Sequence, residues 1–298
     1  MSKGLDIEVR DLRMEFGDTV AVDDLSCRLA GGKIYGLLGR NGAGKTTLLA
    51  VLAAFRKATA GAVLVDGEDP FENTRLMRDI CFVREGNDGT EQLRVRTALS
   101  FASTFRPHWD QAYADRLIER FELPLRKRVG RLSLGQRSAM RVVIGLASRC
   151  PLTIFDEAYL GMDAPSRYSF YEEVLNDYLD NPRTVILSTH LIEEFGSLFE
   201  EVLILDRGRL LVHEDTDTLR ERGTTVTGPA GEVDAYVAGM TVLNEQRLGG
   251  TKAVTVNERL DADQRRQAIA AGLELGPVAL QDLFIHLTER NADREKRP

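Results

Sequence analysis

Apolar and polar residues alternate in the first part of the chain, and a continuous apolar run follows. Residues 7–9, 12–16 and 25–29 are apolar at every second position, which predicts half-buried antiparallel strands. Residues 34–38 form an apolar run that predicts a buried strand and ends in a glycine-rich loop. Residues 47–55 then have the spacing of a helix. We therefore expect the order strand, loop, helix in this region.

Strand-like and helical patterns alternate in the next part of the chain, up to about residue 212. The turn dipeptide Asp66-Gly67 separates two apolar runs, and residues 90–150 have helical spacing with Asp110 as a candidate N-cap. We expect a helical insert there. The remaining elements are strands at residues 62–65, 80–83, 152–155, 184–187, 202–205 and 209–212, with a helix at 165–179. This alternation is typical of a largely parallel sheet.

The pattern changes after about residue 223, where the predicted elements become short. Strands are expected at residues 224–227, 242–246 and 253–256, and helices near 231–238, 263–271 and 279–289. We interpret this part as a small α+β accessory domain. The expected domains are therefore residues 1–222, with a helical subdomain at about 86–150, and residues 223–298.

Composition and charge narrow the class of protein. The 298 residues suffice for one or two domains with a sizeable core. There are 39 Lys and Arg against 46 Asp and Glu, so the net charge is −7. This balance argues against a broad nucleic-acid-binding surface. The basic run at residues 126–128 is interpreted as a solvated face. Cys27, Cys81 and Cys150 are far apart, which indicates neither a disulfide framework nor a zinc site and fits a reducing cytosol.

The N-terminal residues lack the apolar segment of a signal peptide. No stretch of the sequence approaches the roughly 18 apolar residues of a membrane helix. If the protein works at a membrane, we expect another polypeptide to supply the spanning part.

The glycine-rich loop fits the phosphate-loop pattern G-x-x-x-x-G-K-[ST], and it lies between a buried strand and a helix as that pattern requires. Glycines allow successive backbone N–H groups to face phosphate oxygens, and the start of the helix adds its positive dipole end. The Lys45 ammonium is suited to the β- and γ-phosphates, the Thr46 hydroxyl to Mg²⁺ and Thr47 to the α-phosphate. The candidate nucleotide-binding residues of the loop are Gly39, Asn41, Gly42, Ala43, Gly44, Lys45, Thr46 and Thr47.

A second candidate anchor lies at the end of the apolar run 152–155, where Asp156 and Glu157 follow directly. A carboxylate in this position can hold Mg²⁺ and its coordinated water opposite a phosphate loop. Glu157 is the candidate general base, because it lies one residue beyond the metal ligand and can deprotonate the attacking water. Lys45 and Glu157 are thus both candidate catalytic residues.

The segment Leu132-Ser133-Leu134-Gly135-Gln136 resembles the LSGGQ signature of ATP-binding cassette (ABC) ATPases, and it precedes Asp156 by about twenty residues, as in that family. Ser133, Gly135 and Gln136 match the signature, whereas Leu134 departs from its first glycine. Ser133 and Gln136 also fit a helix capping box, and the two readings are compatible. In the family this segment binds the γ-phosphate held by the opposite subunit.

Three further positions match the order of the family's motifs. Phe16 resembles the aromatic residue that stacks on adenine, although a core phenylalanine is an open alternative. Asp163, in Gly161-Met162-Asp163, resembles the D-loop and also fits an N-cap. His190 resembles the switch histidine that contacts the γ-phosphate, which makes it the third candidate catalytic residue.

Two positions depart from the family. The resemblance implies a glutamine at the end of the strand before the helical insert, where Glu85 stands, so Glu85 joins Thr46 and Asp156 as a candidate metal ligand. Gln92 is the alternative if the register differs. Ala158 replaces the usual proline after the general base.

The resemblance covers residues 5–215 and implies an α/β P-loop NTPase of ABC type. Its parts are a mixed core sheet, an antiparallel β subdomain and a helical subdomain, to which this chain adds the α+β accessory domain. It further implies ATP and Mg²⁺ as cofactors, hydrolysis of ATP, and a head-to-tail homodimer or heterodimer with a second ATPase subunit. The expected partners are transmembrane permease chains, which would hold the protein on the cytoplasmic face of the membrane, with export as the expected direction. A soluble ABC ATPase acting on ribosomes or nucleic acid is the alternative, and a P-loop kinase is a third possibility.

Overall fold

The computed structural model describes residues 4–86 and 89–295. Contacts divide the chain into two compact units. The first unit comprises Met1–His190 and Leu198–His213, and the second comprises Leu191–Ser197 and Glu214–Pro298. The boundary expected between residues 222 and 223 therefore lies inside the second unit, which also takes in helix α8 (Thr216–Arg220).

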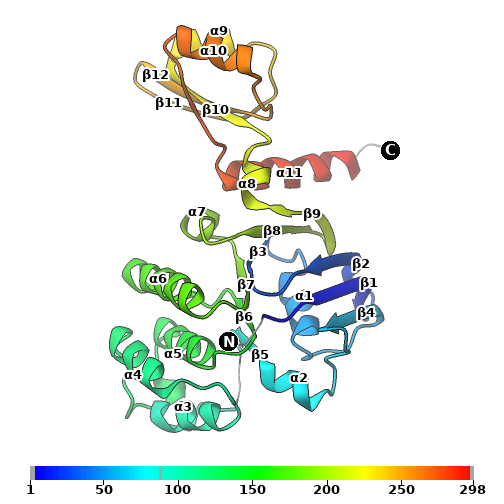
Figure 1. Ribbon diagram of the computed structural model, residues 1–298, viewed down its shortest axis with the longest axis vertical. Helices are drawn as coiled ribbons and strands as arrows, with labels where there is room; N and C mark the ends of the chain where they lie inside the picture. Colours follow the sequence, from blue (N-terminus) through cyan, green and yellow to red (C-terminus); the bar gives the residue numbers. More distant parts are fainter. Residues whose placement is uncertain (1–3, 87–88, 296–298) are drawn as a thin grey trace. The chain divides into compact units, whose positions relative to one another are not determined.

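The core of the first unit is a sheet in which parallel strands bring their carboxyl ends to one edge (Figure 1). Its order is β5 (Ile80–Arg84), β6 (Leu152–Asp156), β7 (Thr184–Thr189), β3 (Ile34–Gly39), β8 (Glu201–Asp206) and β9 (Arg209–Asp215). The strands from β5 to β8 pair in parallel. Asp156 pairs with both Arg84 and Ser188, so the segments that follow β5, β6 and β7 leave the sheet side by side. Strands β3, β6 and β7 are buried along their whole length, as their continuous apolar sequences predict.

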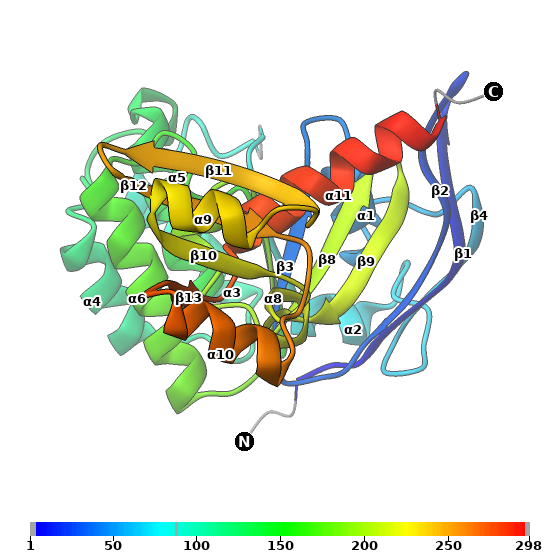
Figure 2. The ribbon, with the colours of Figure 1, turned by 90° about the horizontal axis from the view of Figure 1, so that it is seen from above.

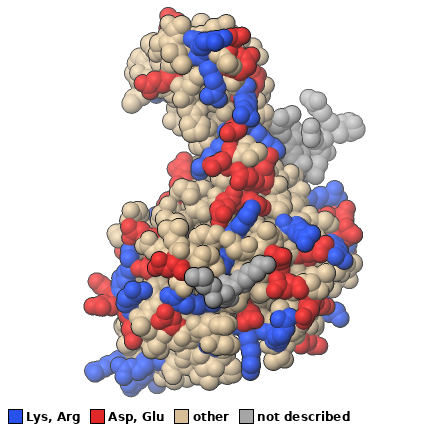
Figure 3. Space-filling model, viewed as in Figure 1, with Lys and Arg blue, Asp and Glu red and all other residues tan. Residues whose placement is uncertain are grey.

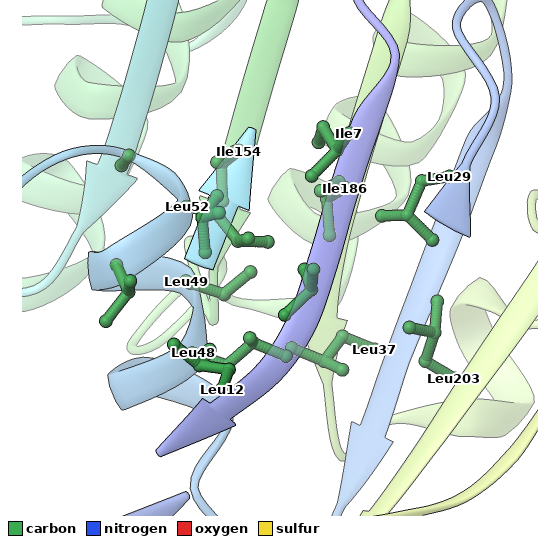
Figure 4. Packing of buried hydrophobic residues seen from close by; sticks show 14 of the residues in the cluster. Ile7, Leu12, Leu29, Leu37, Leu48, Leu49, Leu52, Ile154, Ile186 and Leu203 are labelled. Carbon is green, nitrogen blue, oxygen red and sulfur yellow. The ribbon is translucent and has the colours of Figure 1, made fainter. Parts of the chain in front are cut away.

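A second, antiparallel sheet covers helix α1 (Lys45–Leu52), and it has the order β2 (Thr19–Leu29), β1 (Ile7–Phe16) and β4 (Ala60–Val65). Alternate residues of β1 and β2 enter a common apolar cluster with α1 and the core sheet. Figure 4 shows Ile7, Leu12 and Leu29 of this sheet facing Leu48, Leu49 and Leu52 of the helix and Leu37, Ile154, Ile186 and Leu203 of the core strands. This cluster fixes α1, and with it the loop before α1.

The expected helical insert is present and lies on the side of the first unit away from β1 and β2 (Figure 1). Helix α2 (Thr74–Asp79) joins β4 to β5, and the insert contains α3 (Val95–Thr104), α4 (Gln111–Arg120), the short η1 (Val129–Arg131) and α5 (Leu134–Ala147). Helix α6 (Ala164–Asp180) follows β6, and its Phe170 ring lies 5.2 Å from that of Phe155. Buried Asp177 of α6 also pairs with buried Arg183, which ties the helix to the start of β7.

The second unit is a βαββαβ arrangement with flanking helices. Its elements are α7 (Ile192–Phe195), α8, β10 (Thr224–Pro229), α9 (Ala230–Tyr236), β11 (Val242–Leu248), β12 (Thr251–Val256), α10 (Ala262–Ala270), β13 (Glu274–Gly276) and α11 (Leu280–Glu295). The strands form an antiparallel sheet of order β11-β12-β10-β13, and α9 and α10 cover one face (Figure 2). Val226, Val254 and Val256 point to these helices. Thr255 contacts Asp282 of α11 instead, as alternation along a strand requires.

Within residues 4–86 and 89–295, no helix is both long and apolar enough to cross a lipid bilayer. On the face of the first unit seen in Figure 3, positive and negative side chains are interspersed.

Candidate functional site

The loop between β3 and α1 is held in one conformation by its neighbours. Gly44 is the N-cap of α1 and has a φ of 102°, and a Cβ added to it would lie 2.5 Å from the carbonyl oxygen of Ala21. Only glycine fits this position. The Gly208 N–H donates to the carbonyl of Ala43 at 2.9 Å, which anchors the loop to the turn between β8 and β9. Since glycine has no side chain to cap α1, the first-turn N–H groups remain suited to an anion.

A cavity of about 590 Å³ opens above this loop. It brings the predicted phosphate loop together with the carboxylates predicted from the ends of two other strands. Its lining residues are Ala21, Asn41, Gly42, Ala43, Gly44, Lys45, Thr46, Thr47, Glu85, Asp156, Glu157 and Leu160. The cavity therefore combines backbone and ammonium donors for phosphate with oxygen ligands for a cation.

The ammonium of Lys45 lies at the centre of this site, and its side chain is 6% exposed. Its Nζ donates to the carbonyl of Gly39 at 2.7 Å and lies 3.6 Å from Oε1 of Glu157. A buried charge is stable only with such partners. The lysine thus links the loop to the carboxylate after β6.

Asp156 and Thr46 supply oxygen atoms that suit a hard cation. The Ser188 hydroxyl, on the neighbouring strand β7, donates to Oδ1 of Asp156 at 2.6 Å and fixes this buried carboxylate. Among the described residues, no group of three or more His, Cys, Asp or Glu side chains is arranged as a metal cage. This donor set fits Mg²⁺, which usually keeps water and substrate phosphates as ligands instead of an all-protein cage.

Glu157 turns the chain sharply away from the sheet, with a φ of 46°. Its N–H donates to the carbonyl of Ser188 at 3.2 Å, and its carbonyl accepts from Leu160 at 3.1 Å. Its Oε2 lies 3.4 Å from Nδ1 of His190, which follows β7 directly. The carboxylate therefore stands between Lys45 and His190.

The segment that resembles the signature is the start of α5. Ser133 caps the helix, and the Ser133 hydroxyl and the Gln136 side chain form the reciprocal capping box expected from the sequence. A Cβ on Gly135 would lie 2.4 Å from the carbonyl oxygen of Gly161, so this glycine allows a close approach to the loop that carries Asp163. The side chain of Leu134 lies against Gly161.

Asp163 caps α6, and its carboxylate accepts from the Ser166 N–H at 3.0 Å. Hydrogen bonds from the Ser166 side chain and backbone lower the pKa of Asp163. Of the described residues that line the cavity, none is Ser133, Gly135, Gln136 or Asp163. These predicted residues therefore lie outside the phosphate-loop cavity of their own chain.

The three remaining sequence predictions have distinct positions. Phe16 is 40% exposed at the end of β1, with the Arg56 guanidinium carbon 4.9 Å from its ring centre, so the alternative of a core phenylalanine is wrong. Phe16 does not belong to the described lining of the cavity. Glu85 does line it, directly after β5, whereas the alternative Gln92 is absent from that described lining.

Several residues of the site were not identified from the sequence. Ala21 and Leu160 line the cavity, and no sequence signal points to either. Ala21 is brought in by the packing of a distant segment, and Leu160 follows Glu157 in the same loop. Ser188 and Tyr159 contact the predicted residues directly. Each lies two residues from a residue that the sequence already singles out, Ser188 before His190 and Tyr159 after Glu157.

Comparisons with known proteins agree with this geometry. A family profile described as "ABC transporter" matches residues 22–160. The daunorubicin resistance ATP-binding protein DrrA3 of Streptomyces coeruleorubidus is 30% identical over 308 residues, covering 95% of this chain and 95% of the relative. The Nod factor export ATP-binding protein I of Rhizobium sp. (strain N33) is 29% identical over 300 residues, covering 97% of this chain and 98% of the relative.

Solved structures show the same fold in the first part of the chain. An ATP-binding subunit of an ABC transporter superposes with a TM-score of 0.64 at 23% identity, covering 72% of this chain and 91% of that one. A dimeric bacterial ABC transporter cassette superposes with a TM-score of 0.63 at 19% identity, covering 70% of this chain and 98% of that one. At these identities the likeness concerns the fold alone.

Proposed function

Since this chain belongs to the ATP-binding cassette (ABC) family of transporter ATPases, we propose that it binds ATP with Mg²⁺ and hydrolyses it to drive export through separately encoded permease chains. The observation that carries this proposal is the single cavity in which the phosphate loop, Asp156 and Glu157 meet. The names of two similar proteins, one for daunorubicin resistance and one for Nod factor export, support the export direction. Binding to a permease would hold the chain on the cytoplasmic face of the membrane.

We infer the role of each side chain in the reaction from its position. The N–H groups of the loop and the Lys45 ammonium bind the phosphates, and Thr46 and Asp156 hold Mg²⁺, which neutralises phosphate charge when it is bound. Glu157 accepts a proton from water as the water oxygen attacks the γ-phosphorus and ADP leaves. His190 lies on the other side of Glu157 and donates to the γ-phosphate. Phe16, exposed at the end of β1, stacks on the adenine.

A second subunit would supply the rest of the site. Ser133, Gly135, Gln136 and Asp163 lie outside the described lining of the chain's own cavity. Ser133 caps the start of α5, and a helix N-terminus favours an anion such as phosphate. Two copies placed head to tail bring each signature segment onto the other copy's nucleotide. We infer that ATP closes this dimer and that hydrolysis releases it.

Mixing two inactive variants tests this arrangement. Ser133→Arg blocks the signature segment, and Lys45→Met disables the phosphate loop, so neither variant is expected to hydrolyse ATP alone. An equal mixture should recover up to roughly a quarter of wild-type activity, because random pairing makes half of the dimers mixed and each mixed dimer has one complete site. Steady-state phosphate release measures this. A mixture as inactive as its components would contradict pairing through the signature segment.

The surface of the helical insert is suited to a membrane partner. Phe101 of α3 and Phe105, the residue that follows α3, are 58% and 59% exposed, and Phe55 beside the insert is 58% exposed. Phe55 also lines a separate cavity of about 390 Å³, together with Arg106 and Arg141. Exposed aromatic side chains next to a groove are typical of protein interfaces. We propose that a short cytoplasmic helix of the permease binds here.

Removing these aromatic side chains should release the protein from membranes. The variant Phe101→Ser, Phe105→Ser is expected to leave the membrane fraction of its native host, while its basal ATP hydrolysis as a purified chain stays unchanged. Tyr168→Ser on α6, which removes another exposed aromatic ring (64%), is the matched control and should remain membrane-associated. The measurement is quantitative immunoblotting of membrane, ribosome and soluble fractions. Wild-type protein found with ribosomes instead of membranes would contradict the permease proposal and support the soluble alternative.

A further inference from the structure

Tyr159 lies two residues beyond Glu157 in the same loop, but it belongs to none of the motifs identified in the sequence. Its side chain is buried, with 4% exposed. Its hydroxyl lies 3.0 Å from Nδ1 of His190, and the two ring centres are 5.6 Å apart. The tyrosine ring therefore packs at a tilt against the imidazole that follows β7.

The hydroxyl of Tyr159 has further contacts with the same segment. It accepts from the backbone N–H of His190 at 3.1 Å and from the hydroxyl of Thr189 at 3.0 Å. A phenolic oxygen has a single hydrogen of its own to donate. With the oxygen accepting from two donors, Nδ1 of His190, 3.0 Å away, is within reach of that hydrogen. A neutral imidazole that accepts at Nδ1 carries its proton on Nε2.

We propose that Tyr159 is a positioning residue for ATP hydrolysis, because its hydroxyl fixes both the ring orientation and the Nε2–H tautomer of His190. This inference rests on the proposed function, in which His190 donates to the γ-phosphate. With Nδ1 engaged by Tyr159, Nε2–H is the ring donor that remains for phosphate. The hydroxyl also binds the His190 backbone N–H, so ring and backbone are held by one group.

The same arrangement affects Glu157. Its Oε2 lies 3.4 Å from Nδ1, which would make an ion pair if Nδ1 carried a proton. An unprotonated Nδ1 donates nothing to the carboxylate. Glu157 therefore keeps its oxygen free to accept the proton of the attacking water. Tyr159 thus separates the roles of the two residues: one binds phosphate and the other deprotonates water.

The variant Tyr159→Phe keeps the buried ring and removes only the hydroxyl. We expect kcat for ATP hydrolysis to fall roughly 3–10-fold, the effect of losing one neutral hydrogen bond, while KM for ATP changes less than about twofold. Tyr113→Phe is the matched control, because Tyr113 of α4 is also buried and its hydroxyl donates to the carboxylate of Glu173 on α6, away from the phosphate-loop cavity. Its kcat should equal that of wild type. Thermal unfolding of both variants establishes that each is folded.

A double-variant comparison separates positioning from a general structural effect. If Tyr159 acts through the imidazole, Tyr159→Phe should lower kcat no further when it is added to His190→Ala. An equal loss in both backgrounds would overturn the proposal. So would a fall in kcat for Tyr113→Phe as large as that for Tyr159→Phe.

Nitrogen-15 NMR of the histidine rings gives a readout that does not depend on activity. At alkaline pH, where imidazole is neutral, His190 in the full-length wild-type chain should show the Nε2–H tautomer, with the signal assigned by its absence in His190→Ala. Tyr159→Phe should convert it to a mixture of tautomers. An Nδ1–H tautomer in wild type would overturn the inference. If wild-type protein did not hydrolyse ATP at all, the proposed function would fail, and the tautomer would still decide whether Tyr159 orients His190.

Discussion

Replacing Glu157 with glutamine is expected to lower the rate of ATP hydrolysis by about 10²–10⁴-fold, the usual contribution of a general base. The amide keeps the size of the side chain and cannot accept the proton of water. ATP affinity should stay close to wild type, because the variant leaves unchanged the loop and Lys45, to which we assign the phosphate contacts. Single-turnover phosphate release measures the chemical step, and calorimetric titration with ATP measures the affinity.

The control for this variant is Glu172→Gln, which removes an acid from α6, where Glu172 pairs with Arg120 on the surface. It should hydrolyse ATP at the wild-type rate. In the presence of ATP, the Glu157→Gln variant should also accumulate as a dimer, since closure continues while release is blocked. Hydrolysis within a factor of a few of wild type would show that another group deprotonates the water.

Replacing Lys45 with methionine should weaken ATP binding roughly 10–100-fold, because each charge-assisted hydrogen bond lost is worth about 1.5–3 kcal/mol. Hydrolysis should be lost as well. Methionine has a similar length and no charge, so the 6% exposed site stays filled. Equilibrium binding of a fluorescent ATP analogue, competed with ATP, gives the affinities.

Two companion variants sharpen the Lys45 experiment. Lys45→Arg keeps the positive charge, but it replaces a compact ammonium with a larger, planar guanidinium group. This variant should therefore also fail to hydrolyse ATP. Lys57→Met, which removes an exposed lysine near Phe71, should bind and hydrolyse ATP normally. An unchanged ATP affinity for Lys45→Met would show that the loop does not bind the nucleotide through this side chain.

The sequence predicts the core of the fold and most of the cavity because local signals and spacing coincide there. Residues 34–38 are apolar without interruption and lead into a glycine-rich loop, and the structure has β3, the loop and α1 in that order. The placement of Glu85 follows from the apolar run before it, and it lines the cavity with the phosphate loop as expected. For both the phosphate loop and Glu85, one short stretch of sequence is enough to predict the position.

Features that depend on packing between distant segments were not predictable. Ala21 enters the cavity because β2 approaches Gly44, and nothing near Ala21 in the sequence indicates that contact. The hydrogen bond from Tyr159 to His190 joins two strand ends whose register appears only in the folded sheet. Likewise, the alternating strands after residue 223 predict an α+β unit, but not the order β11-β12-β10-β13.

The backbone of Glu157 has a consequence for the stability of the protein. A φ of 46° is the left-handed conformation, which costs a residue with a Cβ about 1 kcal/mol relative to glycine. The bend turns the side chain away from the direction of β6, so that the carboxylate reaches both Lys45 and His190. A glycine at this position would relieve the backbone strain, but the same substitution would remove the carboxylate that we propose as the general base. The sharp turn after β6 is therefore a local trade-off between folding stability and turnover.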